Sequence, residues 1–216
     1  MEIKVYDNVL KANDRLAENN RRVFAERGIT AINFIASPGS GKTTLLEVTV
    51  PRFRDRTGLS IGVIEGDVAT TRDAERISRL EVPVVQINTR GGCHLDAGQI
   101  GSVLSDIGNP DLLFIENVGN LVCPAAYDLG EAHTVAMVSV AEGDDKILKY
   151  PAAFRRSSVV LLNKIDLLPL LNYNMDQVRQ DLAQVAPGTE ILEMSCTAGT
   201  GLDAWIEWLV RAQEGS

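Results

Sequence analysis

The sequence predicts an α/β fold with a seven-stranded, mostly parallel sheet flanked by helices. Short apolar runs recur along the chain, and the segments between them are long enough for crossover helices. The runs are continuously apolar rather than alternating, which is typical of strands that are covered on both faces. We expect strands at residues 29–36, 59–66, 82–88, 111–116, 134–140, 158–163 and 190–195.

The composition is that of an ordinary globular protein. We expect one domain over residues 1–216, because no repeat or Pro/Gly-rich linker divides the chain. Neither a secretory signal nor an apolar run of roughly 18 residues is present, so we expect a cytoplasmic protein without a membrane partner. The net charge of −8 argues against a nucleic-acid partner, and the odd number of cysteines, 3, suggests thiols rather than disulfides.

A helix is expected at the amino terminus, over about residues 7–27. Its apolar positions fall at helical spacing: Val9, Ala12, Leu16 and Val23. Gly28 is a plausible stop for this helix. We expect the apolar stripe to pack on the flank of the sheet, and a helix that docks a partner is the alternative.

The first strand runs into the loop ASPGSGKTT, residues 36–44, and a helix is expected to follow. This arrangement is typical of a phosphate-binding loop, and it predicts the P-loop NTPase fold. Gly39 and Gly41 let backbone N–H groups converge on phosphate oxygens, Lys42 supplies charge, and the Thr43 hydroxyl suits Mg²⁺. Ala36 stands where the motif has its first glycine, and a small residue is tolerable there. The alternative is an ordinary structural turn.

A second motif, NKID, follows the strand at 158–163. Asp166 can accept the N1–H and 2-amino donors of guanine, Asn163 can bond O6 or N7, and the Lys164 stem can stack on the base. The segment after the last strand, Ser195–Cys196–Thr197, is placed to supply a second base-contacting loop. An ordinary strand-to-turn transition is the alternative there.

Two carboxylates also stand at predicted strand ends. Asp67 and Glu116 can hold Mg²⁺ or orient the attacking water, and the Gly119 N–H can reach the γ-phosphate. Each carboxylate could instead be a helix cap or a surface charge. Together these motifs predict a GTPase with GTP or GDP and Mg²⁺ as ligands. The expected nucleotide-binding residues are Gly39, Ser40, Gly41, Lys42, Thr43, Thr44, Gly119, Asn163, Lys164, Asp166, Ser195, Cys196 and Thr197, with Lys42, Thr43, Asp67 and Glu116 as the catalytic and Mg²⁺ set.

Cys93, His94 and Cys123 form a candidate site for Ni²⁺ or Zn²⁺. Two thiols and an imidazole suit either ion, and a two-fold dimer could supply the missing ligand. The alternative is that the cysteines are small buried hydrophobes. Cys123 lies four residues beyond Gly119, so a loop that senses the γ-phosphate would also move a thiolate. Cys196 and His133 are expected to be structural.

These motifs together resemble the HypB family of GTPases for nickel insertion into [NiFe]-hydrogenases. The matching segments, in order, are SPGSGKTTLL, EGDVATTRDAERI, INTRGGCHLDA, ENVGNLVCP, VAEGDDKILKYP, NKIDLLP and SCTAGTGLDAW. The resemblance implies a GTP-promoted homodimer with a Ni/Zn site at its interface. It also implies cooperation with HypA to deliver nickel to the hydrogenase large subunit. A histidine-rich tract, which some members carry, is absent from the sequence.

Two other functions are considered. The urease-accessory GTPase is similar but has a Cys-Pro-His metal motif, whereas this sequence has Cys93–His94 without the proline. A metal-binding dimerisation switch with incidental GTPase activity is the second. Turnover is expected to be slow, because no glutamine or arginine finger is evident. Arg72 is a candidate for action in trans, and Lys146 is a candidate dimer contact.

Overall fold

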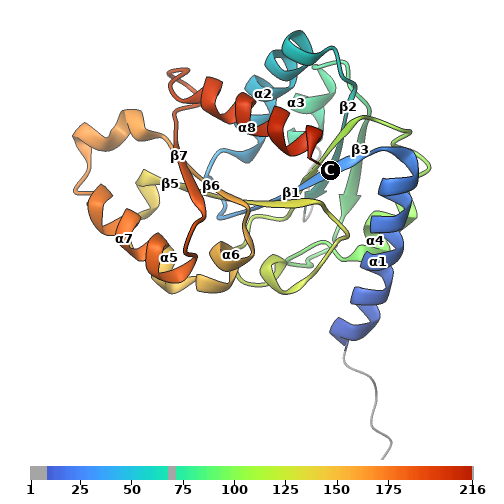
Figure 1. The fold of residues 1–216 in the computed structure, drawn as a ribbon, viewed down its shortest axis with the longest axis horizontal. Helices are drawn as coiled ribbons and strands as arrows, with labels where there is room; N and C mark the ends of the chain where they lie inside the picture. Colours follow the sequence, from blue (N-terminus) through green and yellow to red (C-terminus); the bar gives the residue numbers. More distant parts are fainter. Residues whose placement is uncertain (1–8, 68–71, 216) are drawn as a thin grey trace, which may run out of the picture.

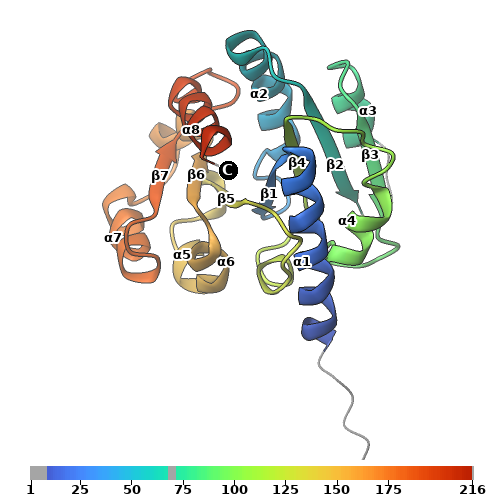
Figure 2. The same cartoon turned by 45° about the vertical axis from the view of Figure 1, so that its right-hand side comes forward.

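The computed structural model describes residues 9–67 and 72–215, which form one parallel sheet between two layers of helices (Figures 1 and 2). The strand order is β3-β2-β4-β1-β5-β6-β7, and every neighbouring pair is parallel. The strands are β1 (Thr30–Ala36), β2 (Ile61–Asp67), β3 (Val84–Asn88), β4 (Leu112–Glu116), β5 (His133–Ser139), β6 (Val159–Asn163) and β7 (Glu190–Glu193). The predicted α/β class and all seven strands are therefore confirmed.

The helices cover both faces of this sheet. On one face, α2 and α8 enclose a core with β1, and on the other, α1 and α4 cover one half while α5, α6 and α7 cover the other half. The α-helices are α1 (Val9–Arg27), α2 (Lys42–Thr57), α3 (Arg72–Ser78), α4 (Ala97–Val103), α5 (Lys146–Lys149), α6 (Pro151–Arg156), α7 (Met175–Val185) and α8 (Leu202–Glu214). The 3-10 turns are η1 (Pro124–Ala126), η2 (Val140–Glu142) and η3 (Ile165–Leu170).

Burial on both faces explains the apolar strands. All seven residues of the central strand β1 are buried, whereas the edge strands β3 and β7 are partly exposed. The buried Trp205 of α8 lies 6.0 Å from the ring of Phe34 and donates from Nε1 to the Thr49 hydroxyl of α2 at 2.9 Å. This contact fixes α8 against the helix that follows the phosphate-binding loop.

The N-terminal helix packs on the flank of the sheet as expected, and Val23 of the predicted stripe is half-buried there, but the prediction is wrong for two other positions. The expected start at Asp7 lies outside the described residues, and Gly28 ends the helix with a left-handed φ of 67°. Leu16 is 48% exposed, and Ala12 is exposed as well. The buried stripe is instead Asn13, Ala17, Asn20 and Phe24. The asparagines are buried because their amides bond to the backbone of neighbouring loops.

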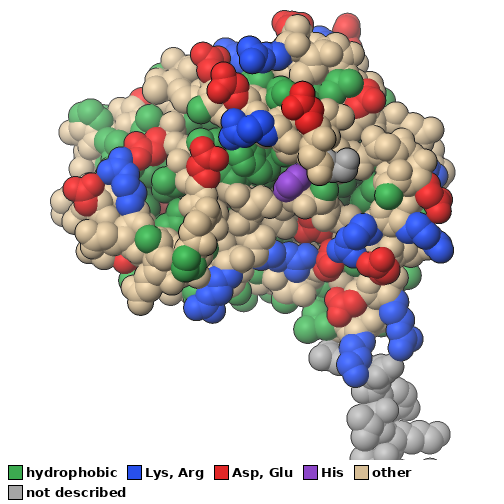
Figure 3. All heavy atoms as spheres, viewed as in Figure 1, with side chains coloured by type: hydrophobic (Ala, Val, Ile, Leu, Met, Phe, Trp, Pro, Cys, Tyr) green, Lys and Arg blue, Asp and Glu red, His purple; other side chains and the backbone are tan. Residues whose placement is uncertain are grey.

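The surface carries charges of both signs. On the face shown in Figure 3, Lys and Arg side chains are interspersed with Asp and Glu. In the described part of the chain, none of the helices has the length and apolarity needed to cross a bilayer.

Candidate nucleotide site and metal centre

The loop after β1 adopts a conformation that depends on glycine. Gly39 and Gly41 have φ values of 77° and 103°, which L side chains rarely adopt. A Cβ on Gly41 would also lie 2.6 Å from Asn163 Nδ2. The loop ends at the start of α2, so the helix N-terminus and its unpaired N–H groups face the cavity. Ala36 is fully buried, which is consistent with a small residue at the exit from the strand.

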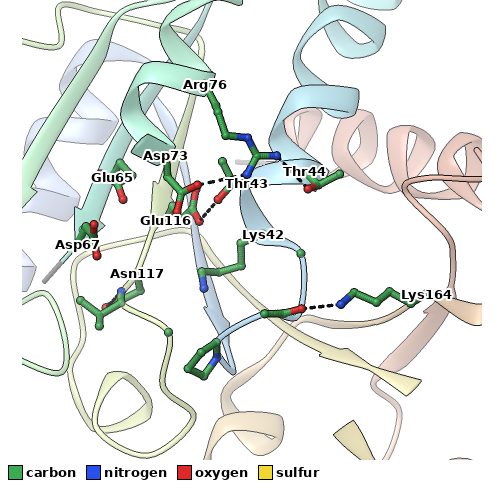
Figure 4. Close-up of a pocket in the computed structure, with 16 residues that line it drawn as sticks. Lys42, Thr43, Thr44, Glu65, Asp67, Asp73, Arg76, Glu116, Asn117 and Lys164 are labelled. Carbon is green, nitrogen blue, oxygen red and sulfur yellow. Dashed lines mark hydrogen bonds and ion pairs between the residues drawn. The ribbon is translucent and has the colours of Figure 1, made fainter. Parts of the chain in front are cut away.

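A cavity of about 520 Å³ lies between this loop and the carboxyl ends of β2 and β4. In Figure 4, Lys42 points into it from the loop, and the carboxylates of Glu65, Asp67 and Glu116 lie along the opposite wall. The predicted residues Gly39, Gly41, Lys42, Thr43, Thr44, Asp67, Glu116, Gly119 and Lys164 all line this cavity.

Glu116 and Thr43, both expected in the Mg²⁺ set, contact each other directly. The Thr43 hydroxyl donates to Glu116 Oε1 at 2.9 Å, and Glu116 is only 4% exposed. Burial raises the pKa of Glu116 to about 7, although the nearby Lys42 ammonium opposes this rise. Its second oxygen, Oε2, is buried without a hydrogen-bond partner. A hydroxyl beside an unpaired carboxylate oxygen fits the ligand preference of Mg²⁺.

The sequence analysis missed Glu65. It pairs in register with Glu116 on the neighbouring strand, is 3% exposed and has an unpartnered, buried Oε2. Burial, followed by repulsion from Glu116 and Asp67, raises the pKa of Glu65 to about 8. The available signal was a glutamate inside an otherwise apolar strand, two residues before Asp67. The cavity lining therefore holds four carboxylates, and the two that are buried, Glu65 and Glu116, favour the binding of a divalent cation.

Arg76 of α3, which the sequence analysis also missed, lies at the rim of the cavity and links two residues of α2. Its guanidinium donates to both oxygens of Glu47, at 2.9 and 2.6 Å, and to the Thr44 hydroxyl at 3.1 Å. The Thr44 hydroxyl is thus already used within the protein. The side chain of Arg72, the candidate for action in trans, lies outside the described part of the structure.

The two expected base-binding loops lie side by side. Asn163 Nδ2 donates to Ser40 O at 2.9 Å, and its Oδ1 accepts from the Cys196 N–H at 3.2 Å. Asn163 therefore ties the phosphate-binding loop to the loop after β7. Lys164 donates to Gly39 O at 2.7 Å, so its stem runs along the end of the cavity. Direct contact of either side chain with a base stays a prediction.

The other base-loop residues lie beyond the lining of the phosphate cavity. Asp166 and Thr197 are exposed, whereas Ser195 and Cys196 are buried. The Ser195 hydroxyl accepts from the Ala198 N–H at 3.0 Å and shapes this loop. Cys196 packs in the core, as expected. His133, also expected to be structural, lies edge-on to Trp208 with a centroid separation of 5.5 Å.

Cys93, His94 and Cys123 come together within one chain. Their potential ligand atoms all lie within 4.8 Å of one another. A hydrogen bond with the Cys123 thiol raises the pKa of Cys93. A divalent cation bound there would displace thiol protons. Burial lowers the pKa of His94, which favours the neutral, metal-binding imidazole. The His94 ring stacks on Tyr127 at 3.8 Å. The donor set fits a soft or borderline divalent ion such as Ni²⁺ or Zn²⁺.

The metal cluster is physically joined to the phosphate-binding loop. Asn120 forms an antiparallel bridge with Ala36, and its Nδ2 donates to Cys93 O at 3.2 Å. A Cβ on the adjacent Gly119 would lie 3.1 Å from Pro38 Cα, so this backbone lies directly on the phosphate-binding loop. The segment of residues 119–123 thus contacts both the phosphate-binding loop and the Cys93 loop, and it carries Cys123.

Lys146, the candidate dimer contact, lies next to this segment. It borders a second cavity of about 390 Å³ with Asn120 and Val122. Its Nζ lies 3.9 Å from Glu142 Oε2 and 5.6 Å from the centre of the Tyr150 ring.

We predict that Glu65→Gln removes a pH-dependent loss of stability. The folded-state pKa of Glu65 is raised from 4.5 to about 8. Its contribution to stability is fully present below pH 4.5 and is lost as the pH rises through 8, because the unfolded chain ionises first. Without nucleotide or divalent cation, the Tm of the wild type should fall relative to that of the variant as the pH rises from 6 to 8.5, by roughly 5 °C or more. Calorimetry checks this, with Glu207→Gln on α8 as the exposed control. An equal pH dependence for variant and wild type would contradict it.

Comparison with known proteins places this geometry in a family. Residues 30–193 match the family model for the CobW/HypB/UreG nucleotide-binding domain. The hydrogenase maturation factor HypB of Escherichia coli strain K12 is 49% identical over 209 residues, which are 96% of this chain and 71% of that protein.

Two solved structures share the fold over nearly the whole chain. The HypB structure from Archaeoglobus fulgidus has a TM-score of 0.88 at 40% identity, covering 94% of this chain and 100% of that one. The HypB structure from Helicobacter pylori, solved in complex with nickel, has a TM-score of 0.88 at 36% identity and covers 94% and 96%. The chain described here therefore belongs to the HypB family of hydrogenase maturation factors, within the CobW/HypB/UreG nucleotide-binding proteins.

Proposed function

We propose that this chain is a GTP-hydrolysing metallochaperone that inserts nickel into the large subunit of [NiFe]-hydrogenase. One observation carries the proposal. The segment that lies on the phosphate-binding loop through Gly119 also bears Cys123, and Cys123 lies with Cys93 and His94 in one cluster. Membership in the HypB family and the nickel complex of the Helicobacter pylori relative support the choice of metal and of process.

The nucleotide half of the proposal is supported by buried groups that lack partners. Ser40 Oγ, Glu65 Oε2 and Glu116 Oε2 are all buried and unbonded, and such groups are costly unless a ligand satisfies them. Lys42 and the N–H groups of the loop would bind the phosphates, and Thr43, Glu116 and Asp67 would hold Mg²⁺. The ion would neutralise charge that develops on the phosphates. GTP turnover would be slow, because neither the phosphate-binding loop nor the NKID motif supplies an arginine finger or a catalytic glutamine.

The metal half of the proposal treats nickel as cargo. Three donors leave a coordination position open, which a second copy, a HypA-type chaperone or the hydrogenase precursor could fill in turn. We propose a GTP-promoted homodimer within which Lys146 contacts the partner. Zinc suits the same donors and would compete for them.

The two alternative functions fit less well. A urease-accessory role is disfavoured by Cys93–His94 without an intervening proline, although one relative, from Helicobacter pylori strain J99, is named a hydrogenase/urease maturation factor. A dimerisation switch with incidental GTPase activity would show single-turnover hydrolysis that Asp67→Asn leaves unchanged.

We predict that Asp166→Ala selectively weakens guanine binding. The exposed carboxylate of Asp166 follows the Lys164 turn and is free to accept the N1–H and 2-amino groups of the base. The variant should bind GDP roughly 100-fold more weakly and lose its preference for GDP over IDP, which lacks the 2-amino group. Fluorescence titration measures both affinities, with Glu207→Ala as control. A retained preference would show that another residue recognises guanine.

We predict that nickel affinity depends on the bound nucleotide. Because Gly119 and Cys123 belong to one segment, the nickel Kd should differ about tenfold between GDP and a non-hydrolysable GTP analogue. Chelator competition gives both values. Cys123→Ser should weaken nickel binding at least as much, whereas His133→Gln should not change it. Equal nickel affinities in the two nucleotide states would remove the coupling from the proposal.

A further inference from the structure

The N-terminal helix α1 buries the side-chain amides of Asn13 and Asn20. These amides face residue 97 and residues 128–129, which follow the two parts of the metal cluster in the sequence. Asn13 and Asn20 are 5% and 1% exposed and stand two turns apart on the buried stripe of α1. Figure 2 shows α1 running alongside α4 on the outer face of the sheet. Buried amides weaken a core unless they are bonded, so their partners indicate what the helix holds.

Each amide contacts both segments. Asn13 accepts from the Ala97 N–H at 2.9 Å and donates to Asp128 O at 2.8 Å. Asn20 donates to Ala97 O at 2.8 Å and to Leu129 O at 3.0 Å. Four hydrogen bonds therefore span the gap between residue 97 and residues 128–129, with α1 as the common support.

These segments directly follow the metal donors. Ala97 is three residues beyond His94, and Asp128 is next to Tyr127, on which the His94 ring stacks. Cys123 lies five residues before Asp128, across the turn η1. By holding residue 97 at a fixed distance from residues 128–129, the two amides also fix the distance between the Cys93–His94 loop and the segment that carries Cys123.

The packing leaves little freedom for α1 to shift. A Cβ on Gly130, whose φ is 89°, would lie 2.5 Å from Ala17 O and 2.8 Å from the Arg21 N. Arg21 also forms an ion pair with Asp128 at 2.8 Å. The loop after Cys123 therefore lies directly on the helix backbone, between the two asparagines.

Building on the proposed function, we infer that Asn13 and Asn20 are positioning residues for the metal centre. Through the backbone at Ala97 and at residues 128–129, α1 holds the thiols and the imidazole at binding distance. The helix is thereby a structural control point for nickel, distinct from the control that the phosphate-binding loop exerts through Gly119. A shift of α1 would spread the donors without touching the nucleotide cavity.

The test is a nickel titration of the full-length protein with GDP bound. Asn20→Leu keeps the number and branching of the side-chain heavy atoms and removes two of the four bonds. It should weaken nickel binding by about tenfold or more, since partners that orient metal ligands have effects of this size. It should also alter the nickel–thiolate charge-transfer absorption, while GDP affinity stays within about twofold of the wild type. Asn13→Leu, which removes the other two bonds, should act in the same direction and serves if Asn20→Leu does not fold.

Phe24→Leu is the matched control, because Phe24 packs on the same stripe but bonds neither segment. It should lower Tm without changing the absorption band. If both asparagine variants bind nickel with wild-type affinity and spectrum, or if Phe24→Leu changes both equally, the amides of Asn13 and Asn20 have no specific positioning role. Cys93→Ser is measured alongside. A wild type that binds no more nickel than Cys93→Ser would overturn the proposed function and the role of α1 with it, whereas failure of the asparagine variants alone leaves the proposed function intact.

Discussion

The contact of residues 119–120 with the phosphate-binding loop is the constraint on which the rest of the site depends. Gly119 lies against Pro38, and Asn120 pairs with Ala36 while its amide bonds to Cys93 O. Since protein interiors are closely packed, a change at the loop must be accommodated by the segment that carries Cys123. The parallel sheet makes the contact possible, because it brings the carboxyl ends of β1, β3 and β4 to the same edge.

The electrostatics of the cavity act together with this contact. Glu65 and Glu116 are buried, with pKa values raised to about 8 and about 7, and lie across the cavity from the Lys42 ammonium. Phosphates alone would repel these carboxylates, so the geometry favours nucleotide that arrives with a divalent cation. Nucleotide that binds with its cation would supply partners for the buried, unbonded oxygens of Glu65 and Glu116. At the same edge of the sheet, His94, Cys93 and Cys123 form the cluster that we propose binds a second, softer ion.

Much of this could be predicted from the sequence, because the relevant signals are local. Each strand is a short apolar run, and the ends of the strands carry the glycines, Lys42, Thr43, Glu116 and Asn163. The resemblance of the ordered motifs to the HypB family added the predictions of a nickel site and of a role in hydrogenase maturation. Cys93 and Cys123 are 30 positions apart in the sequence, and their proximity follows from β3 and β4 ending on the same side of the sheet.

The features that the sequence did not reveal have a common cause. In each, contacts between distant parts of the chain determine which side chains are buried. Glu65 sits in an apolar strand and is visible as a site residue only once its register with Glu116 is known. The stripe of α1 was predicted from hydrophobicity, yet the helix turns Leu16 outward and buries Asn13 and Asn20, since backbone groups of two distant loops satisfy their amides. The sequence also did not show that Asn163 hydrogen-bonds to both Ser40 and Cys196, while its contact with a base stays a prediction.

The most direct test of the account is the ratio of nickel dissociation constants with saturating GDP and with a saturating GTP analogue, measured in Gly119→Ala. The added methyl group would lie 3.1 Å from Pro38 Cα, so the segment and the phosphate-binding loop would have to shift apart slightly, while all three metal donors remain. The account predicts that both ligands still bind and that the ratio falls to near one. A ratio equal to that of the wild type would show that nucleotide and metal communicate by another route.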